Sequence, residues 1–246
     1  MLRPVPAIAA ALLEPLAAAP ERTGIFLDFD GVLAPIVSRP EDAVVPAETR
    51  AELERLVARY ALVSIVSGRT GDDVGGRVGV EGLTVIGTHG LELDPAAEHW
   101  RRQIREFAAD APWPPARTEL KGLSVAFHFR DVEDEAAALR ELDLLALRAT
   151  DEGLAPRFGR KVLEVLPPTG SNKGTAVRLL LEQAGLTRAL VAGDDATDID
   201  AFRAVDDLEY AVRVAVVADE SPTALRDEAD IVLQSPAEFL ELLRRL

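Results

Sequence analysis

Cysteine is absent from this chain, which excludes disulfide bonds, thiolate catalysis and zinc–thiolate sites. The absence fits a reducing compartment, and we expect the protein to be cytoplasmic. The sequence also lacks any apolar run close to the roughly 18 residues of a membrane-spanning helix, so no membrane partner is expected. The apolar stretch at residues 4–20 is broken by Glu14 and Pro15. We interpret it as an amphipathic lead-in helix rather than a signal peptide.

Positive charge is scarce as well. The 246 residues include 27 Lys and Arg against 42 Asp and Glu, which gives a formal net charge of −15. Such an excess of negative charge repels nucleic acid and anionic membranes, so no nucleic-acid partner is expected. It would also repel a phosphorylated ligand, and any phosphate site in this chain must therefore bring its own cation or a metal ion. Hydrophobic residues make up 48% of the chain, as in a soluble globular protein with a substantial core.

The first and last thirds of the chain alternate between strand-like and helix-like patterns. We predict strands at 25–28, 61–66, 83–86, 188–192 and 231–233, and helices at 46–59, near 72 and at 173–183. This alternation predicts an α/β fold, in which a parallel sheet carries helices on both faces. In such sheets, ligands bind beyond the carboxyl ends of the strands.

The middle of the chain has a different, α+β pattern. We predict helices at 97–110 and 133–149, and strands at about 116–121, 123–130, 155–158 and 161–166. Pro167 and Pro168 close this segment. The sequence therefore predicts a core domain of residues 1–92 and 168–246, interrupted by a smaller inserted domain of residues 93–167.

The segment FLDFDGVLAPI at residues 26–36 places two aspartates where a buried strand ends. Because strand side chains alternate, Asp28 and Asp30 are expected to point to the same side. Repulsion between them, together with desolvation, should raise the pKa of one carboxyl group unless a cation lies between them. The alternative is a simple strand-to-turn junction in which an aspartate caps the turn.

A second acidic cluster lies in GDDATDIDAF at residues 193–202, where Asp194, Asp195, Asp198 and Asp200 crowd one strand-to-helix turn. Carboxylate oxygens suit Mg²⁺, which takes one or two protein carboxylates together with water and phosphate oxygens. An acidic helix N-terminus, with Thr197 or Asp198 as its cap, would explain one or two of these acids but not four. The cluster therefore predicts a magnesium site.

Two further elements could hold an anion. Ser67 and Gly68 follow a predicted strand, where a hydroxyl and backbone N–H groups can cradle a phosphate, although Ser-Gly is also ordinary turn chemistry. Lys173 stands at a helix start, with Ser171 or Asn172 as the cap. A cation there opposes the helix dipole, which makes sense if it binds an anion. The alternative is a solvated surface lysine.

The order of these elements resembles the four signature motifs of phosphatases of the haloacid dehalogenase superfamily: acid pair, hydroxyl residue, lysine, acid cluster. Within that superfamily, LDFDGVLAPI, SGR, GTHG, KVLEVLP, NKG and GDDATDIDAF together resemble the trehalose-6-phosphate phosphatase family. Two positions depart from it, because the family usually has Thr at Val32 and Glu at Ile199. The resemblance implies a Rossmann-like core and, as the inserted domain, a cap that closes over the sugar.

The resemblance also implies roles for individual residues. Asp28 would be the nucleophile that forms an aspartyl-phosphate, and Asp30 the general acid and base. Mg²⁺ would bind Asp28, the backbone carbonyl of Asp30 and Asp194, with Asp195 or Asp198 in support. Ser67, Gly68 and Lys173 would hold the phosphoryl oxygens.

Alternation in residues 123–130 separates two faces of one predicted strand. Leu123, Val125, Phe127 and Phe129 share the face suited to packing on helices, and Ser124, Ala126, His128 and Arg130 share the polar one. In the family, residues of such a polar cap face hold sugar hydroxyls, and our candidates for that role are Lys121, His128, Arg130 and Glu164. Glu164 could instead be a surface residue of a half-exposed strand. His89 is expected to be either a site residue or a structural histidine bonded to backbone at its glycine turn.

The function implied by the resemblance is Mg²⁺-dependent hydrolysis of a sugar phosphate, with trehalose 6-phosphate as the first candidate, by a chain that we expect to be a monomer. Two alternatives stay open. The same scaffold could act on sucrose phosphate or a glycosylglycerate phosphate, with only the cap contacts changed. The chain could also be a non-catalytic sugar-phosphate sensor, against which the complete set Asp28, Asp30, Lys173 and Asp194 argues.

Overall fold

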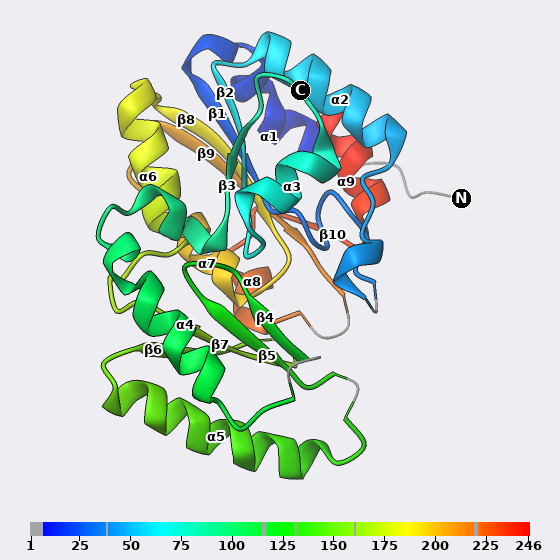
Figure 1. Ribbon diagram of the computed structural model, residues 1–246. Coiled ribbons are helices and arrows are strands. Elements are labelled where there is room, and N and C mark those ends of the chain that lie inside the picture. The colour runs from blue at the N-terminus through cyan, green and yellow to red at the C-terminus, as the bar shows by residue number, and fades with distance from the viewer. Residues whose placement is uncertain (1–6, 38, 115–116, 131, 160, 219–220) are drawn as a thin grey trace. The chain divides into compact units, whose positions relative to one another are not determined.

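The computed structural model describes residues 7–37, 39–114, 117–130, 132–159, 161–218 and 221–246 (Figure 1). The chain divides into two compact units. We call residues 1–90 and 172–246 the core unit, and residues 91–171 the inserted unit. Each unit has its own sheet and its own buried apolar cluster. The functional domain roles expected from the sequence stay a prediction.

The described part of the core unit forms a six-stranded sheet in the order β10–β9–β8–β1–β2–β3, and every neighbouring pair of strands is parallel. The strands are β1 (Thr23–Leu27), β2 (Leu62–Val66), β3 (Thr84–Ile86), β8 (Arg188–Gly193), β9 (Tyr210–Val216) and β10 (Ile231–Leu233). The parallel sheet is therefore confirmed, although the sequence did not single out β9. Chain order runs outward from β1 on one side and from β8 on the other, so the order reverses between these two strands.

Helices cover both faces of this sheet. Successive strand residues point to opposite faces, so each strand offers side chains to both helix layers. The helices are α1 (Ala7–Ala17), α2 (Ala47–Arg59), α3 (Gly71–Val78), α6 (Lys173–Ala184), α7 (Ala196–Arg203), α8 (Thr223–Asp227) and α9 (Pro236–Leu243). Ile25 and Leu27 of β1 belong to the buried cluster that α1, α2 and α9 share. Helices α6 and α7 contact each other and lie against the other face, over β2 and β8 (Figure 1).

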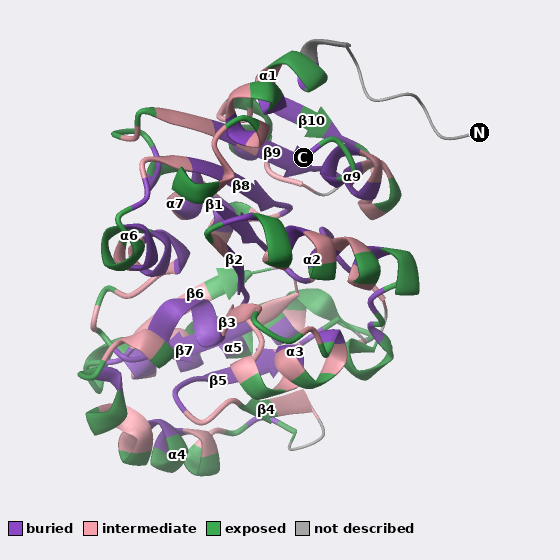
Figure 2. Cartoon of the chain, turned by 90° about the horizontal axis from the view of Figure 1, so that it is seen from above, coloured by how far each residue is buried: buried purple, intermediate pink, exposed green. Residues whose placement is uncertain are grey.

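The predicted lead-in helix is present as α1, with Pro15 inside it. Leu13 and Leu16 of this helix are fully buried in the core cluster. The helix therefore contributes to the hydrophobic core rather than only preceding it. Figure 2 shows how the central strands β1, β8 and β9 are buried between the helix layers.

The inserted unit has an antiparallel sheet in the order β4–β5–β7–β6, as its α+β pattern predicts. Its elements are α4 (Arg101–Asp110), β4 (Thr118–Leu120), β5 (Val125–His128), α5 (Glu135–Asp151), β6 (Ala155–Gly159) and β7 (Val162–Leu166). Val125, Phe127 and Phe129 pack in one cluster with Phe107 of α4 and Leu142 of α5. One face of this sheet is therefore covered by helices.

Three sequence expectations for the inserted unit need correction. Strand β5 is shorter than the predicted 123–130, and Lys161 lies outside β7 because its backbone is left-handed, with φ of 57°. Leu123 does not join the helix-covered cluster but packs with Leu91 and Leu166 in a smaller one. The start of the predicted strand 116–121 includes residue 116, which lies outside the described residues.

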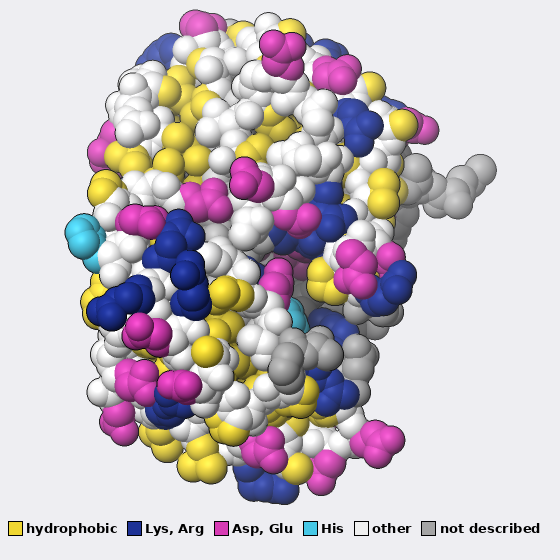
Figure 3. Space-filling view, viewed as in Figure 1, with side chains coloured by type: hydrophobic (Ala, Val, Ile, Leu, Met, Phe, Trp, Pro, Cys, Tyr) yellow, Lys and Arg dark blue, Asp and Glu magenta, His cyan; other side chains and the backbone are white. Residues whose placement is uncertain are grey.

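On the face of the molecule seen in Figure 3, Asp and Glu side chains are mixed with Lys and Arg side chains over the surface. No helix within the described ranges is both long and apolar enough to cross a membrane.

Candidate active site

Three strands of the core sheet deliver polar side chains to one edge. Asp28 follows β1, Ser67 follows β2 and Asp194 follows β8. Since β1 pairs in parallel with both β2 and β8, their carboxyl ends are neighbours. The order of the sheet reverses between β1 and β8, which is where ligands bind in sheets of this kind. The fold thus assembles residues that are distant in sequence.

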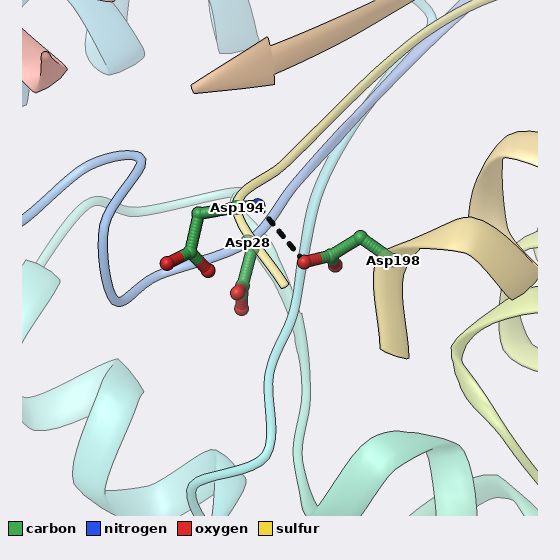
Figure 4. A group of neighbouring side chains, drawn as sticks. All are labelled: Asp28, Asp194 and Asp198. Carbon is green, nitrogen blue, oxygen red and sulfur yellow. Dashed lines mark hydrogen bonds between the residues drawn. The ribbon is translucent and has the colours of Figure 1, made fainter. Parts of the chain in front are cut away.

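Asp28, Asp194 and Asp198 form a buried acidic cluster (Figure 4). One carboxylate oxygen from each lies within 4.8 Å of the others. Asp198 is held in place because its Oδ2 accepts hydrogen bonds from the backbone N–H groups of Asp194 and Asp195, both at 3.0 Å. The side chain of Asp195 caps helix α7 and accepts a hydrogen bond from the N–H of Ala196. Helix capping therefore aims Asp198 toward the cluster.

Lys173, the first residue of α6, supplies the positive charge beside this cluster. Its Nζ lies 2.9 Å from Asp28 Oδ1 and 2.7 Å from Asp198 Oδ1. The cap of α6 is Asn172, whose side chain accepts a hydrogen bond from the N–H of Thr175. Burial lowers the pKa of Lys173, but the charges of Asp198 and Asp28 outweigh burial, so that the pKa is raised overall. Lys173 is therefore a buried cation rather than a solvated surface lysine.

Lys173 contacts two of the three buried carboxylates, those of Asp28 and Asp198. Burial, as the largest cause, raises the pKa of Asp28 to about 7; Lys173 opposes the increase, and Asp198 and Asp30 add to it. This confirms the prediction that one carboxyl of the Asp28–Asp30 pair has a raised pKa. A buried set of neighbouring carboxylate oxygens fits Mg²⁺, a hard divalent cation.

Two glycines allow the carboxylates to approach this closely. Gly31 has φ of +78°, and a Cβ there would lie 2.4 Å from Oδ2 of Asp194. A Cβ on Gly193 would lie 2.1 Å from the Cβ of Asp198. Any other residue at these positions would displace an acid of the cluster.

Asp30, by contrast, has a different cation as its partner. Its two carboxylate oxygens accept hydrogen bonds from Arg69 Nε at 2.7 Å and Nη2 at 2.9 Å. Its carboxylate is not part of the acidic cluster of Asp28, Asp194 and Asp198. The sequence motif SGR does not by itself predict this ion pair of Arg69. A charged residue directly after a strand-end Ser-Gly pair was the available signal.

Ser67 and Gly68 lie in a loop that is fixed by backbone hydrogen bonds. The N–H of Ser67 donates to Ile86 O, and its carbonyl accepts from the N–H of His89, both at 2.9 Å. The His89 ring lies against Gly68, where a Cβ would be 2.6 Å from Cε1. His89 is buried, with φ of 54°. The hydrogen bond to Ser67 uses the main chain of His89, so the choice between a site residue and a structural histidine stays a prediction.

In the inserted unit, Lys121 and Glu164 lie together, with Lys121 Nζ 2.9 Å from Glu164 Oε1. The Ser124 hydroxyl donates to the same oxygen at 3.3 Å. His128 instead contacts Glu119, at 3.0 Å between Nε2 and Oε2. Arg130 is exposed in the turn that follows β5. The structure thus brings together two of the four predicted sugar-contacting residues.

Two more charged residues share this polar face and were missed. Glu119 pairs with Ala126 in the sheet register, and Ala126 pairs with Glu164, which in turn pairs with Arg157 on β6. Residues that pair directly lie on the same face of a sheet. The hydrogen bond from His128 lowers the pKa of Glu119. The antiparallel register was needed to find both residues, because strand pairing cannot be read from alternation alone.

Comparison with known proteins places this site in a family. The trehalose-phosphatase family model matches residues 26–236. An uncharacterized glycosyl hydrolase of Mycobacterium tuberculosis is 37% identical over 210 residues, which cover 75% of this chain but only 15% of that protein. Trehalose 6-phosphate phosphatase RA3 of Zea mays is 31% identical over 271 residues, covering 97% of this chain and 74% of that one.

Solved structures agree in fold. The C-terminal domain of trehalose-6-phosphate phosphatase from C. albicans has a TM-score of 0.76 at 21% identity, with 97% of this chain and 96% of that chain covered. A haloacid dehalogenase-like hydrolase from Bacteroides thetaiotaomicron has a TM-score of 0.60 at 16% identity, with 91% and 99% covered. The expected haloacid dehalogenase-like fold is confirmed. With the family model spanning every strand-end motif of the core sheet, the chain belongs to the trehalose-phosphatase family.

Proposed function

We propose that this protein is a Mg²⁺-dependent phosphatase that hydrolyses trehalose 6-phosphate to trehalose and phosphate through an aspartyl-phosphate on Asp28. The observation that carries the proposal is the placement of Asp28, buried at the end of β1 between Lys173 and the acids of the β8 end. The name of the Zea mays relative supports the choice of substrate. This chain covers only 15% of the length of its M. tuberculosis relatives, so the activity is stated as a proposal.

Asp28 is restrained for attack by two contacts. Its Oδ1 accepts a hydrogen bond from the N–H of Phe29 at 2.7 Å and lies 2.9 Å from Lys173 Nζ. An oxygen of Asp28 forms the bond to phosphorus while the bond from phosphorus to the sugar oxygen breaks. Asp30 gives its proton to the departing sugar oxygen. Water then attacks the phosphorus and passes a proton to Asp30, and phosphate leaves with Asp28 restored.

The bound metal would neutralise charge on the phosphoryl group. Asp28, Asp194 and Asp198 would hold it, and the closeness of their carboxylate oxygens supports this. The backbone carbonyl of Asp30 and the carboxylate of Asp195 remain proposed ligands from the sequence. Ser67 and Gly68 stay our candidates for phosphoryl contacts, together with Lys173, because their loop lies at the neighbouring strand end.

Sugar selection is assigned to the inserted unit as a cap. Lys121, His128, Arg130 and Glu164 are the proposed sugar contacts, and the polar sheet face that holds Lys121 and Glu164 supports this. Carboxylate and ammonium groups on such a face can bind hydroxyl groups of a disaccharide. The cytoplasmic location and the monomeric state also stay proposals, which cell fractionation and light scattering on a sizing column test.

A phosphate-release screen tests the function. The protein is assayed with Mg²⁺ and with EDTA on trehalose 6-phosphate, sucrose 6-phosphate, a glucosylglycerate phosphate, glucose 6-phosphate and 4-nitrophenyl phosphate. We expect trehalose 6-phosphate to have the highest kcat/KM, EDTA to abolish turnover and Asp28→Asn to be inactive. Preference for another sugar phosphate would keep the reaction and change the substrate. Binding of sugar phosphate without turnover would favour a sensor.

A further inference from the structure

The guanidinium group of Arg69 makes a two-pronged contact with Asp30. Nε and Nη2 donate to the two different oxygens of that carboxylate, at 2.7 and 2.9 Å. An arginine fork that engages both oxygens fixes the plane and the direction of the carboxylate as well as its position. Asp30 needs such a restraint, because 39% of its side chain is exposed.

Arg69 is itself held by its own surroundings. Its Nη1 donates to Asp73 Oδ2 at 3.0 Å, and its guanidinium carbon lies 5.2 Å from the ring centre of Phe29. Asp73 belongs to α3 and is also paired with Arg77 at 2.8 Å. Only 12% of the Arg69 side chain is exposed. The contacts therefore form a chain from a helix, through one arginine, to the carboxylate of Asp30.

The two aspartates of the strand end are thus served by separate cations. Asp28 is paired with Lys173, and Asp30 with Arg69. The acidic cluster that fits a metal contains Asp28 but not the carboxylate of Asp30. The contacts of Arg69 therefore bear on the group that we assign to proton transfer rather than on the nucleophile.

We propose that Arg69 is the positioning residue of Asp30, and that it acts on the transfer of a proton to the leaving oxygen rather than on the attack at phosphorus. This inference rests on the proposed phosphatase function. A sugar alkoxide is a poor leaving group and needs a proton from a well-placed acid. A 4-nitrophenolate leaves without one. Loss of Arg69 should therefore harm the two kinds of substrate unequally.

The test compares the parent with Arg69→Lys and Arg69→Met on both substrates. With trehalose 6-phosphate, we expect kcat to fall by at least about tenfold and KM to change little. With 4-nitrophenyl phosphate, the rate of the first-turnover burst of nitrophenolate reports the attack by Asp28. We expect that rate to stay within about threefold of the parent. The control is Arg39→Gln, which removes an arginine fork of similar geometry from Asp42 on the surface and should leave both rates unchanged.

A double-mutant cycle gives the sharpest readout. In an Asp30→Asn background, the proposal predicts that Arg69→Met lowers the residual turnover of trehalose 6-phosphate by less than about twofold, since residues that act through one another are not additive. Fully additive losses, equal losses on both substrates, or a raised KM with unchanged kcat would each overturn the role of Arg69.

Folding of the variants is checked by their thermal unfolding midpoints. If Arg69→Met does not fold, Asp73→Asn replaces it, because Asp73 contacts Arg69 and makes no bond to Asp30 among the pairs described above. The same unequal pattern is then expected at smaller size, and an equal effect on both substrates contradicts the inference. A parent that releases phosphate from no substrate would overturn the proposed function itself, whereas an active parent with evenly affected variants would overturn only the role of Arg69.

Discussion

The Nζ atom of Lys173 lies 2.9 Å from Oδ1 of Asp28, and both side chains are almost completely buried. The free energy needed to remove two opposite charges from water is often larger than the free energy gained from their attraction. Such a pair is therefore weak evidence for a purely stabilising role. Asp198 shares the same ammonium group. The arrangement is better explained by chemistry that needs a buried carboxylate and a cation at one place.

Lys173→Met should destabilise the protein strongly, because it leaves Asp28 and Asp198 buried without their cation. We expect the free energy of unfolding in urea to fall by about 3 kcal/mol. The matched control is Lys161→Met, which removes an exposed ion pair with Glu135 and should cost less than about 1 kcal/mol. Equal losses in the two variants would show that burial of the Lys173 pair has no energetic consequence.

The stability of the metal-free protein should fall as the pH rises. Folding raises the pKa of Asp28 from 3.8 to about 7, so the native protein keeps a proton that the unfolded chain releases. The stability from this proton is fully present below the unfolded pKa and is lost as the pH rises through the folded one. In EDTA, we expect the unfolding free energy of the parent, relative to Asp28→Asn, to drop by roughly 2–4 kcal/mol between about pH 4 and 8. Parallel curves for the two proteins would contradict the assignment.

Gly31→Ala should abolish activity through displacement of Asp194, because the added Cβ meets Oδ2 at 2.4 Å. Gly79→Ala is the matched control, since Gly79 has a similar φ of +61° with no atom within 4 Å of the added Cβ. Both variants should lose about 1 kcal/mol of stability from backbone strain. Only Gly31→Ala should lose phosphate release, which kinetic assays with saturating Mg²⁺ will measure. Comparable activity in the two would remove the argument for a crowded acidic cluster.

Glu164→Gln should weaken sugar recognition and leave phosphoryl chemistry intact. We expect KM for trehalose 6-phosphate to rise by about tenfold, as for the loss of a charged hydrogen bond of ~1.4 kcal/mol, with kcat/KM for 4-nitrophenyl phosphate unchanged. Glu135→Gln serves as the control, because Glu135, the first residue of α5 in the same unit, is also paired with a lysine, Lys161. If both substrates suffer alike, Glu164 is not a sugar contact.

The sequence was sufficient to predict the elements whose signals are local. Apolar runs ending in polar turns predicted β1, β2 and β8. Of the two caps expected for α6, Ser171 and Asn172, the structure has Asn172. Parallel strands then require their carboxyl ends to meet, so the neighbourhood of Asp28 and Asp194 followed from the fold class. A raised pKa for one carboxyl of the Asp28–Asp30 pair also followed from burial beside a second acid, but which of the two it is came from the structure.

The remaining features depend on contacts between segments far apart in the chain. Nothing in the local sequence shows that Arg69, rather than Lys173, pairs with Asp30. Each pairing depends on where the fold places the two cations. The partnership of His128 with Glu119 likewise depends on antiparallel register. Strand β5 ends earlier than alternation suggests, since the left-handed backbone of Lys161 ends the pairing of β7.

The central claim is that Asp28 takes the phosphoryl group, and chemical trapping tests it most directly. The protein is mixed with Mg²⁺ and trehalose 6-phosphate, quenched within the first turnovers and treated with borohydride, which reduces an aspartyl-phosphate to homoserine. Peptide mass spectrometry should find homoserine at position 28 only when substrate is present, and never in Asp28→Asn. Turnover of substrate with an unmodified residue 28, or with the modification on another aspartate, would contradict the account.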